Sequence, residues 1–128
     1  MSPVDLAHLA RTFFGAYGEG DLEIVRSLLA EDAVVHVTNA DGDLDRVEGR
    51  DRAMARLPDL TGAEWSTGIT QVAVVDDERV MTMIEVKATR KGRELHNFAA
   101  FLARVSGEQI SDLWMVEAQP AYSDEFWS

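Results

Sequence analysis

HNFAAFLARVSGEQISDLWMVEA, residues 96–118, is the stretch that decides how the second half of the chain folds. Two apolar runs flank the polar residues 106–109, a pattern typical of two strands joined by a tight turn. Side chains alternate between the two faces of a strand. If Phe101 faces inward, the inner face of this hairpin is apolar apart from Asn97 and Glu117. The same inner row holds Leu95, Ala99, Ala103, Leu113 and Met115.

Two further long strands are predicted upstream of this hairpin. The four expected strands span residues 64–75, 79–89, 94–105 and 109–118. Short polar turns separate them, at Asp76-Asp77, Lys91-Gly92 and Ser106-Gly107. Consecutive strands with such short connections form an antiparallel meander.

The first half of the chain predicts helices. Ser2-Pro3-Val4-Asp5 is typical of a helix start with Ser2 as the cap, and an apolar stripe at helical spacing follows as far as residues 18–20. Asp21 predicts the N-cap of a second helix, and residues 31–32 are expected to turn the chain. The predicted buried face of that second helix consists of Leu22, Val25, Leu28 and Leu29.

The middle of the chain predicts shorter elements. Residues 33–38 form a β-branched run typical of a strand, residues 39–45 read as turn material, and residues 49–60 predict a short helix that Pro58 stops. The expected fold class is therefore α+β, with N-terminal helices packed on one face of a strongly curved, mainly antiparallel sheet.

Composition limits the classes of partner. The chain has 128 residues, a length that predicts a single domain over residues 1–128, and its formal net charge is −11. That charge repels phosphate backbones and anionic lipid surfaces, so we expect no nucleic-acid or membrane partner. There is no cysteine, no leader-like N-terminus and no run of membrane-spanning length. We therefore expect a cytoplasmic protein without a cofactor.

Residues 13–37 (FFGAYGEGDLEIVRSLLAEDAVVHV), 48–57 (EGRDRAMARL) and 101–128 (FLARVSGEQISDLWMVEAQPAYSDEFWS) resemble the nuclear transport factor 2-like superfamily, and more narrowly its SnoaL-like and ketosteroid-isomerase-like branch. The resemblance covers nearly the whole chain. It implies a cone-shaped domain whose sheet curls around a mostly apolar pocket, usually in a homodimer. It does not settle the reaction, because this fold hosts isomerases, cyclases, dehydratases, epoxide hydrolases and proteins without catalytic activity.

The resemblance also implies where catalytic residues of ketosteroid isomerases would fall. The base, an aspartate on the first strand, corresponds to Val37. The two donors to the substrate oxygen, a tyrosine and a protonated aspartate, correspond to Phe13 and Phe101. None of these side chains transfers a proton, so steroid isomerisation by that mechanism is not expected. The Asp-Arg-Asp constellation of the epoxide-hydrolase relatives is not found on a predicted pocket strand either.

Three polar residues remain as candidates for catalysis. Glu117 is expected to act as general acid or base, since an apolar cavity raises the pKa of a carboxyl group; the alternative is a solvated or paired side chain at the strand end. Tyr17 is expected to donate a hydrogen bond to a substrate oxygen, or else to be a core residue with its hydroxyl at the rim. Asn97 is expected to orient a carbonyl or a water, or else to satisfy a neighbouring backbone group.

Thr82 is a further polar group expected on the pocket wall. The expected substrate-binding wall consists of Phe13, Phe14, Val35, Val37, Ile84, Val86, Phe101, Leu113 and Met115.

Histidines and acidic turns predict no metal site. Regular alternation points His36 away from the pocket unless the strand bulges, and the three histidines are scattered along the sequence. The acidic turn at residues 41–45 lacks the glycine and the glutamate of a calcium-binding loop.

Outward apolar side chains on the sheet predict a partner surface. Trp114 and Val116, with Met81 and Met83 nearby, are expected to form a homodimer interface on the convex face. The segment containing Phe126 and Trp127 needs cover from the same domain or from a second copy, and in the family such a tail often closes the pocket.

Together these observations favour a cofactor-free acid–base enzyme with a small hydrophobic substrate, of isomerase, cyclase, dehydratase or epoxide-hydrolase type. The alternatives are a non-catalytic ligand-binding or dimerisation module, and an accessory protein that docks on a larger enzyme.

Overall fold

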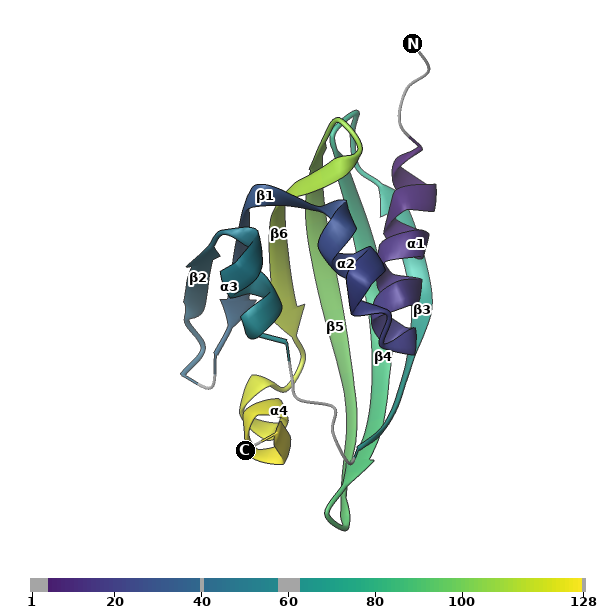
Figure 1. The fold of residues 1–128 in the computed structure, drawn as a ribbon. Coiled ribbons are helices and arrows are strands. Elements are labelled where there is room, and N and C mark those ends of the chain that lie inside the picture. Colours follow the sequence, from purple (N-terminus) through teal and green to yellow (C-terminus); the bar gives the residue numbers. More distant parts are fainter. Residues whose placement is uncertain (1–4, 40, 58–62, 128) are drawn as a thin grey trace.

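A six-stranded sheet with the strand order β2-β1-β6-β5-β4-β3 forms the framework of the protein (Figure 1). The computed structural model describes residues 5–39, 41–57 and 63–127. The helices are α1 (Leu6–Glu19), α2 (Leu22–Leu28), α3 (Arg50–Ala55) and α4 (Pro120–Trp127). The strands are β1 (Leu29–Thr38), β2 (Leu44–Glu48), β3 (Glu64–Val74), β4 (Arg79–Arg90), β5 (Arg93–Ser106) and β6 (Gln109–Glu117). The α+β class and the mainly antiparallel sheet are confirmed.

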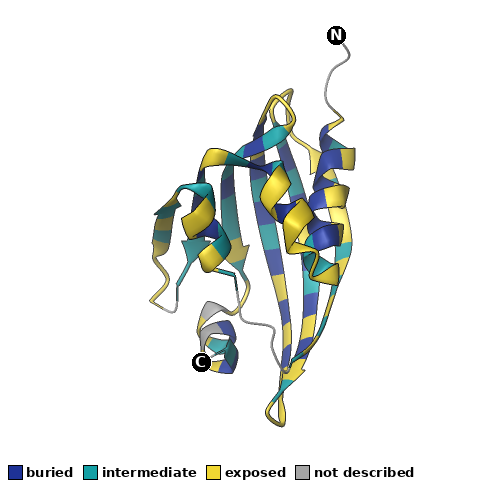
Figure 2. Cartoon of the chain, viewed as in Figure 1, coloured by how far each residue is buried: buried dark blue, intermediate teal, exposed yellow. Residues whose placement is uncertain are grey.

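Strands β3 to β6 form the antiparallel meander that the sequence predicts. The register places Thr82 opposite Phe101, and Phe101 opposite Met115. Alternate residues along β4 and β5 are buried because one face of these strands lies under the helices. In Figure 2 the buried positions recur along these two strands.

The part of the sheet formed by β1 and β2 differs from the prediction. Strand β1 already starts at Leu29, so residues 31–32 lie within the strand instead of turning the chain. It pairs in parallel with β6, with a register shift between Leu29 and Val34, and antiparallel with β2. Strand β2 was not predicted because it is a short edge strand whose composition, LDRVE, is mainly polar.

Helix α1 begins later than the sequence suggests. Its N-cap is Asp5, whose carboxylate accepts a hydrogen bond from the backbone N–H of His8. The predicted start at residues 2–3 lies outside the described residues. The helix ends as predicted, with Gly20 as C-cap at a φ of 74° in the left-handed region, which glycine adopts without strain.

Helix α2 is capped by Asp21 as predicted, but its buried face is narrower than expected. Val25 is buried, whereas Leu22 is 44% exposed. Leu29 is buried as predicted, but it lies in β1 rather than in the helix. Helix α3 ends at Ala55, before Pro58, which lies outside the described residues.

The buried core lies between the helices and the inner face of the sheet. Phe14 from α1 packs against Phe101 from β5, with ring centroids 4.6 Å apart. The C-terminal residues, expected only to need cover, form helix α4, and Phe126 is buried within the same chain. None of the helices in the described ranges is long and apolar enough to span a membrane.

Candidate functional site

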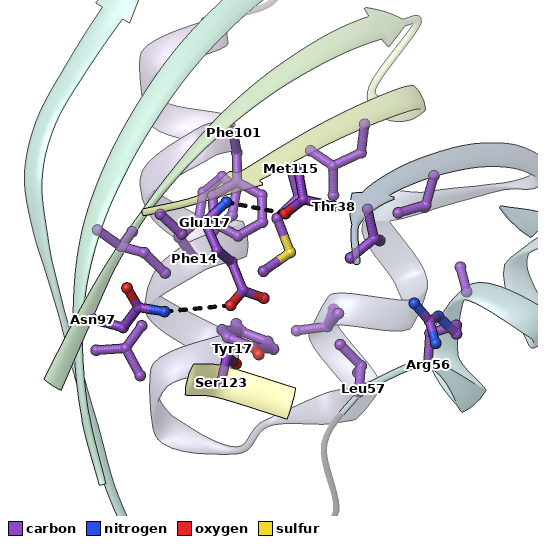
Figure 3. A pocket seen from close by; sticks show the side chains of 18 of the residues that line it. Phe14, Tyr17, Thr38, Arg56, Leu57, Asn97, Phe101, Met115, Glu117 and Ser123 are labelled. Atoms are coloured by element: carbon purple, nitrogen blue, oxygen red, sulfur yellow. Dashed lines mark hydrogen bonds between the residues drawn. The ribbon is translucent and has the colours of Figure 1, made fainter. Parts of the chain in front are cut away.

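A pocket of about 220 Å³ lies against the inner face of the sheet and is lined also by residues of the four helices (Figure 3). Its walls are mainly apolar and aromatic. Every residue predicted from the sequence as catalytic or substrate-binding lies in this lining: Phe13, Phe14, Tyr17, Val35, Val37, Ile84, Val86, Asn97, Phe101, Leu113, Met115 and Glu117. The structure therefore brings the predicted residues together around one cavity, while their chemical roles stay predictions.

Glu117 is the last residue of β6, and its carboxylate extends into the pocket (Figure 3). Its side chain accepts a hydrogen bond at Oε2 from Asn97 Nδ2, at 3.3 Å. Its backbone N–H donates to Thr38 Oγ1, at 3.2 Å, at the end of the neighbouring strand β1. Contacts from β5 and β1 thus hold the residue on both sides.

Asn97 is 4% exposed and sits on β5 beside Glu117. Its Oδ1 accepts hydrogen bonds from the backbone N–H groups of Phe98, at 2.9 Å, and Gln119, at 3.2 Å. Besides Glu117, its Nδ2 also donates to the backbone carbonyl of Gln119, at 3.3 Å. The amide is therefore bonded at both ends.

Tyr17 projects from α1 toward the same region of the pocket (Figure 3). Burial raises the pKa of its hydroxyl far above the ordinary tyrosine value, and the negative charge of Glu117 raises it further. The phenol is therefore protonated throughout the neutral range and acts as a hydrogen-bond donor. Its ring packs edge-on against Trp65, with centroids 5.6 Å apart.

The three residues that the sequence resemblance aligns with catalytic groups of ketosteroid isomerases form apolar walls of the pocket. Phe13 and Phe101 are buried, Val37 is partly buried, and all three line the cavity. At these three positions the pocket wall therefore carries no proton donor or acceptor, and their equivalence to isomerase catalytic residues stays a prediction.

Several lining residues were missed by the sequence reasoning. Arg56, just after α3, lies across the pocket from Glu117 and pairs with Asp45 of β2 at 3.1 Å (Figure 3). Trp127 from α4 was not missed, because it belongs to the tail that the resemblance places near the pocket; it lines part of the wall, and its ring lies 5.6 Å from that of Trp65. The other missed polar contributors are Thr38 and Ser123. The approach of these residues to the cavity depends on tertiary packing. The sequence therefore contains no signal for them beyond the helical spacing of α3 and the aromatic C-terminal tail.

Other candidate residues lie away from the cavity. His36 stacks on Trp114, with centroids 5.0 Å apart and planes 2° apart, and neither lines the pocket. Thr82 was expected on the pocket wall, but it is fully buried outside the pocket lining, and its Oγ1 has no hydrogen-bond partner in the described part of the chain. Within the described ranges, no three histidine, aspartate or glutamate side chains gather into a group that could hold a metal.

Sequence comparison finds relatives over almost the full length. Uncharacterized proteins of Mycobacterium bovis and Mycobacterium tuberculosis are 29% identical to this chain over 125 residues, and each alignment covers 94% of both sequences. The family model described as a SnoaL-like domain matches residues 10–113.

Solved structures show the same fold at low sequence identity. Bal32a, from a soil-derived mobile gene cassette, has a TM-score of 0.81 at 22% identity, with 95% of each chain covered. An NTF2-like protein of unknown function from Burkholderia pseudomallei has a TM-score of 0.77 at 16% identity, covering 94% of this chain and 95% of that one. An LEH-like epoxide hydrolase from Mycobacterium tuberculosis has a TM-score of 0.72 at 16% identity, covering 94% and 87%. The chain has the nuclear transport factor 2-like fold and belongs to the SnoaL-like domain family.

Proposed function

We propose that this protein is a cofactor-free acid–base enzyme that acts on a small apolar molecule carrying a carbonyl group. The observation that supports this most is that a carboxylate, Glu117, and a protonated phenol, Tyr17, converge in a pocket whose other walls are mainly apolar. Such a cavity with a few directing polar groups is typical of a small-molecule site.

In the proposed reaction, ionised Glu117 removes a proton from the carbon next to the carbonyl. The electron pair of the broken C–H bond moves into an enolate, whose oxygen accepts a hydrogen bond from Tyr17. Glu117, now neutral, returns the proton to the same or a different carbon. Isomerisation, cyclisation and dehydration beside a carbonyl all start with this step.

The size of the cavity limits the substrate. A volume of about 220 Å³ lies below the roughly 300–1,000 Å³ of drug-sized ligand pockets. The aromatic walls favour flat, apolar molecules over flexible polar ones. We therefore infer a substrate smaller than a four-ring steroid.

Proton exchange with β-tetralone, an apolar bicyclic ketone, tests this proposal. In heavy water, the wild-type protein should speed deuterium incorporation beside the carbonyl, measured by NMR of the ketone. Glu117→Gln should lower the protein-dependent rate by about 100-fold or more, because general acid–base catalysis contributes at least that much, and it should keep the affinity for the ketone. Glu108→Gln, which removes the same charge from the exposed β5–β6 turn, is the matched control. Equal rates for wild type and Glu117→Gln would exclude Glu117 as the proton carrier.

A second candidate function is a non-catalytic ligand-binding module. The apolar character of Phe13, Val37 and Phe101, at positions where the resemblance places the catalytic groups of ketosteroid isomerases, favours it. In that case the protein binds β-tetralone in a calorimetric titration, and neither wild type nor Glu117→Gln exchanges its protons above the buffer rate.

We also propose that the protein is a homodimer through the face of the sheet turned away from the helices. Met83 and Val116 are 43% and 54% exposed there, in one row across β4, β5 and β6 with Ala100 between them. Such contiguous exposed apolar side chains mark an interaction surface. Light scattering should give a dimer for wild type and a monomer for Val116→Glu. Val74→Glu, at the exposed end of β3, should remain dimeric, and a monomeric wild type would contradict the proposal.

A further inference from the structure

We propose that Asn97 is a positioning residue that aims the carboxylate of Glu117 into the pocket and does not itself contact the substrate. This inference rests on the proposed function, in which Glu117 carries the proton. It replaces the direct contact with a substrate oxygen that the sequence suggests for Asn97.

The orientation of the Asn97 amide follows from its surroundings. Oδ1 faces two backbone N–H groups, those of Phe98 and Gln119. A flipped amide would place its own N–H donors against these two donors, and its carbonyl oxygen against the Glu117 carboxylate. Only one orientation satisfies the network, so the NH₂ group must point at Glu117.

Both N–H donors of this NH₂ group are in use. One points to Glu117 Oε2 and the other to the backbone carbonyl of Gln119, each at 3.3 Å. Because Asn97 is 4% exposed, a ligand has little access to it. A substrate oxygen is therefore left to Tyr17, whose protonated hydroxyl belongs to the lining of the same pocket.

The position of Glu117 explains why it requires such a support. It is the last residue of β6, where the chain leaves the sheet toward α4. The two bonds between Asn97 and the backbone of Gln119 fix this junction, and the third bond fixes the carboxylate relative to it. One buried amide thereby ties β5, the end of β6 and the start of α4 to the proposed catalytic group.

The hydrogen bond can be tested in the wild-type protein by NMR. The side-chain N–H resonances of Asn97 should shift with pH at the same midpoint as the isotope-labelled carboxyl carbon of Glu117. The matched internal control is Asn39, whose Nδ2 donates to Asp45 at 3.0 Å and whose resonances should not follow Glu117. Asn97 resonances that do not respond to the ionisation of Glu117 would overturn the inference.

Asn97→Asp tests the role of the donor. The new carboxylate keeps acceptors for Phe98 and Gln119 but places a second negative charge beside Glu117. Removing a donor and adding a like charge both disfavour ionised Glu117, so its titration midpoint should move up by about one pH unit or more. Gln71→Glu, which makes the same chemical change on the exposed strand β3, should leave the midpoint where it is.

The outcomes separate this inference from the proposed function. A shifted Glu117 midpoint together with no proton exchange by wild type supports positioning and contradicts catalysis. A different outcome is that the Glu117 midpoint is unchanged in Asn97→Asp while β-tetralone exchange still depends on Glu117. That outcome contradicts the positioning role of Asn97 and leaves the catalytic role of Glu117 intact. If Asn97→Asp does not fold, the wild-type resonances of Asn97 decide the question by themselves.

Discussion

Tyr17 shows how the pocket controls a single side chain. Its hydroxyl ionises only at a pH far above the ordinary tyrosine value, because burial and the charge of Glu117 both disfavour the phenolate. A donor that stays protonated keeps its hydrogen bond available at every physiological pH. That property suits the stabilisation of a developing enolate oxygen.

The raised pKa of Tyr17 predicts a dependence of stability on alkaline pH. In the unfolded chain tyrosine loses its proton near pH 10, while folded Tyr17 retains it. Above that pH the folded state binds more protons, so the contribution of Tyr17 to stability is complete below about pH 10 and is lost as the pH rises further. Urea unfolding should therefore show a steeper alkaline loss of stability for wild type than for Tyr17→Phe. Parallel curves would contradict the assignment.

At the level of residues, the sequence predicts the part of the pocket wall formed by the strands better than the part formed by α4 and the residues after α3. Alternation along β4, β5 and β6 is regular, so Ile84, Phe101 and Met115 could be assigned to the inner face before the fold was known. Arg56 and Trp127 reach the cavity from elements without such a period. Their positions depend on how α3 and α4 pack, which a local pattern does not encode.

At the level of elements, helix α4 depends on contacts with the end of the β4–β5 hairpin. Arg90 Nη1 donates to the backbone carbonyl of Trp127, and Arg93 Nη1 to that of Glu125, each at 3.1 Å. Tyr122 Oη donates to the carbonyl of Glu94 at 2.7 Å. Cations that bond the last carbonyls of a helix stabilise its C-terminus. An eight-residue helix is unstable alone, so these contacts maintain it.

Replacing both arginines, as Arg90→Gln with Arg93→Gln, should loosen α4 without unfolding the sheet. Hydrogen exchange measured by mass spectrometry should become faster in residues 120–127 and stay unchanged in β5. Arg52→Gln removes an exposed charge from a different helix, α3, and should have no such effect. Unchanged exchange in α4 would show that apolar packing of Phe126 and Trp127 holds the helix instead.

The same dependence explains which elements the sequence missed. The long strands and α1 carry a strong period of apolar residues and were predicted to within a few positions. Helix α4 is short, and strand β2 is a mainly polar edge strand. Both exist through tertiary hydrogen bonds that composition alone does not reveal.

At the level of the whole molecule, the described strands form one sheet, and the described helices pack with it around one buried core. We propose that residues 1–128 form one domain and unfold as one cooperative unit. Calorimetry should give a single transition whose calorimetric and van't Hoff enthalpies agree, and fluorescence and circular dichroism should report the same midpoint. Two separate transitions would contradict the single-domain proposal.

The central claim is that Glu117 transfers a proton within the pocket, and the pH dependence of β-tetralone exchange tests it most directly. The rate of deuterium incorporation should rise with pH along the ionisation of one carboxyl group, and that rise should coincide with the NMR titration of Glu117. In Glu117→Gln the protein-dependent rate should be low at every pH. A wild-type rate that does not follow the ionisation of Glu117, or a Glu117→Gln variant that retains the same rise, would contradict the account.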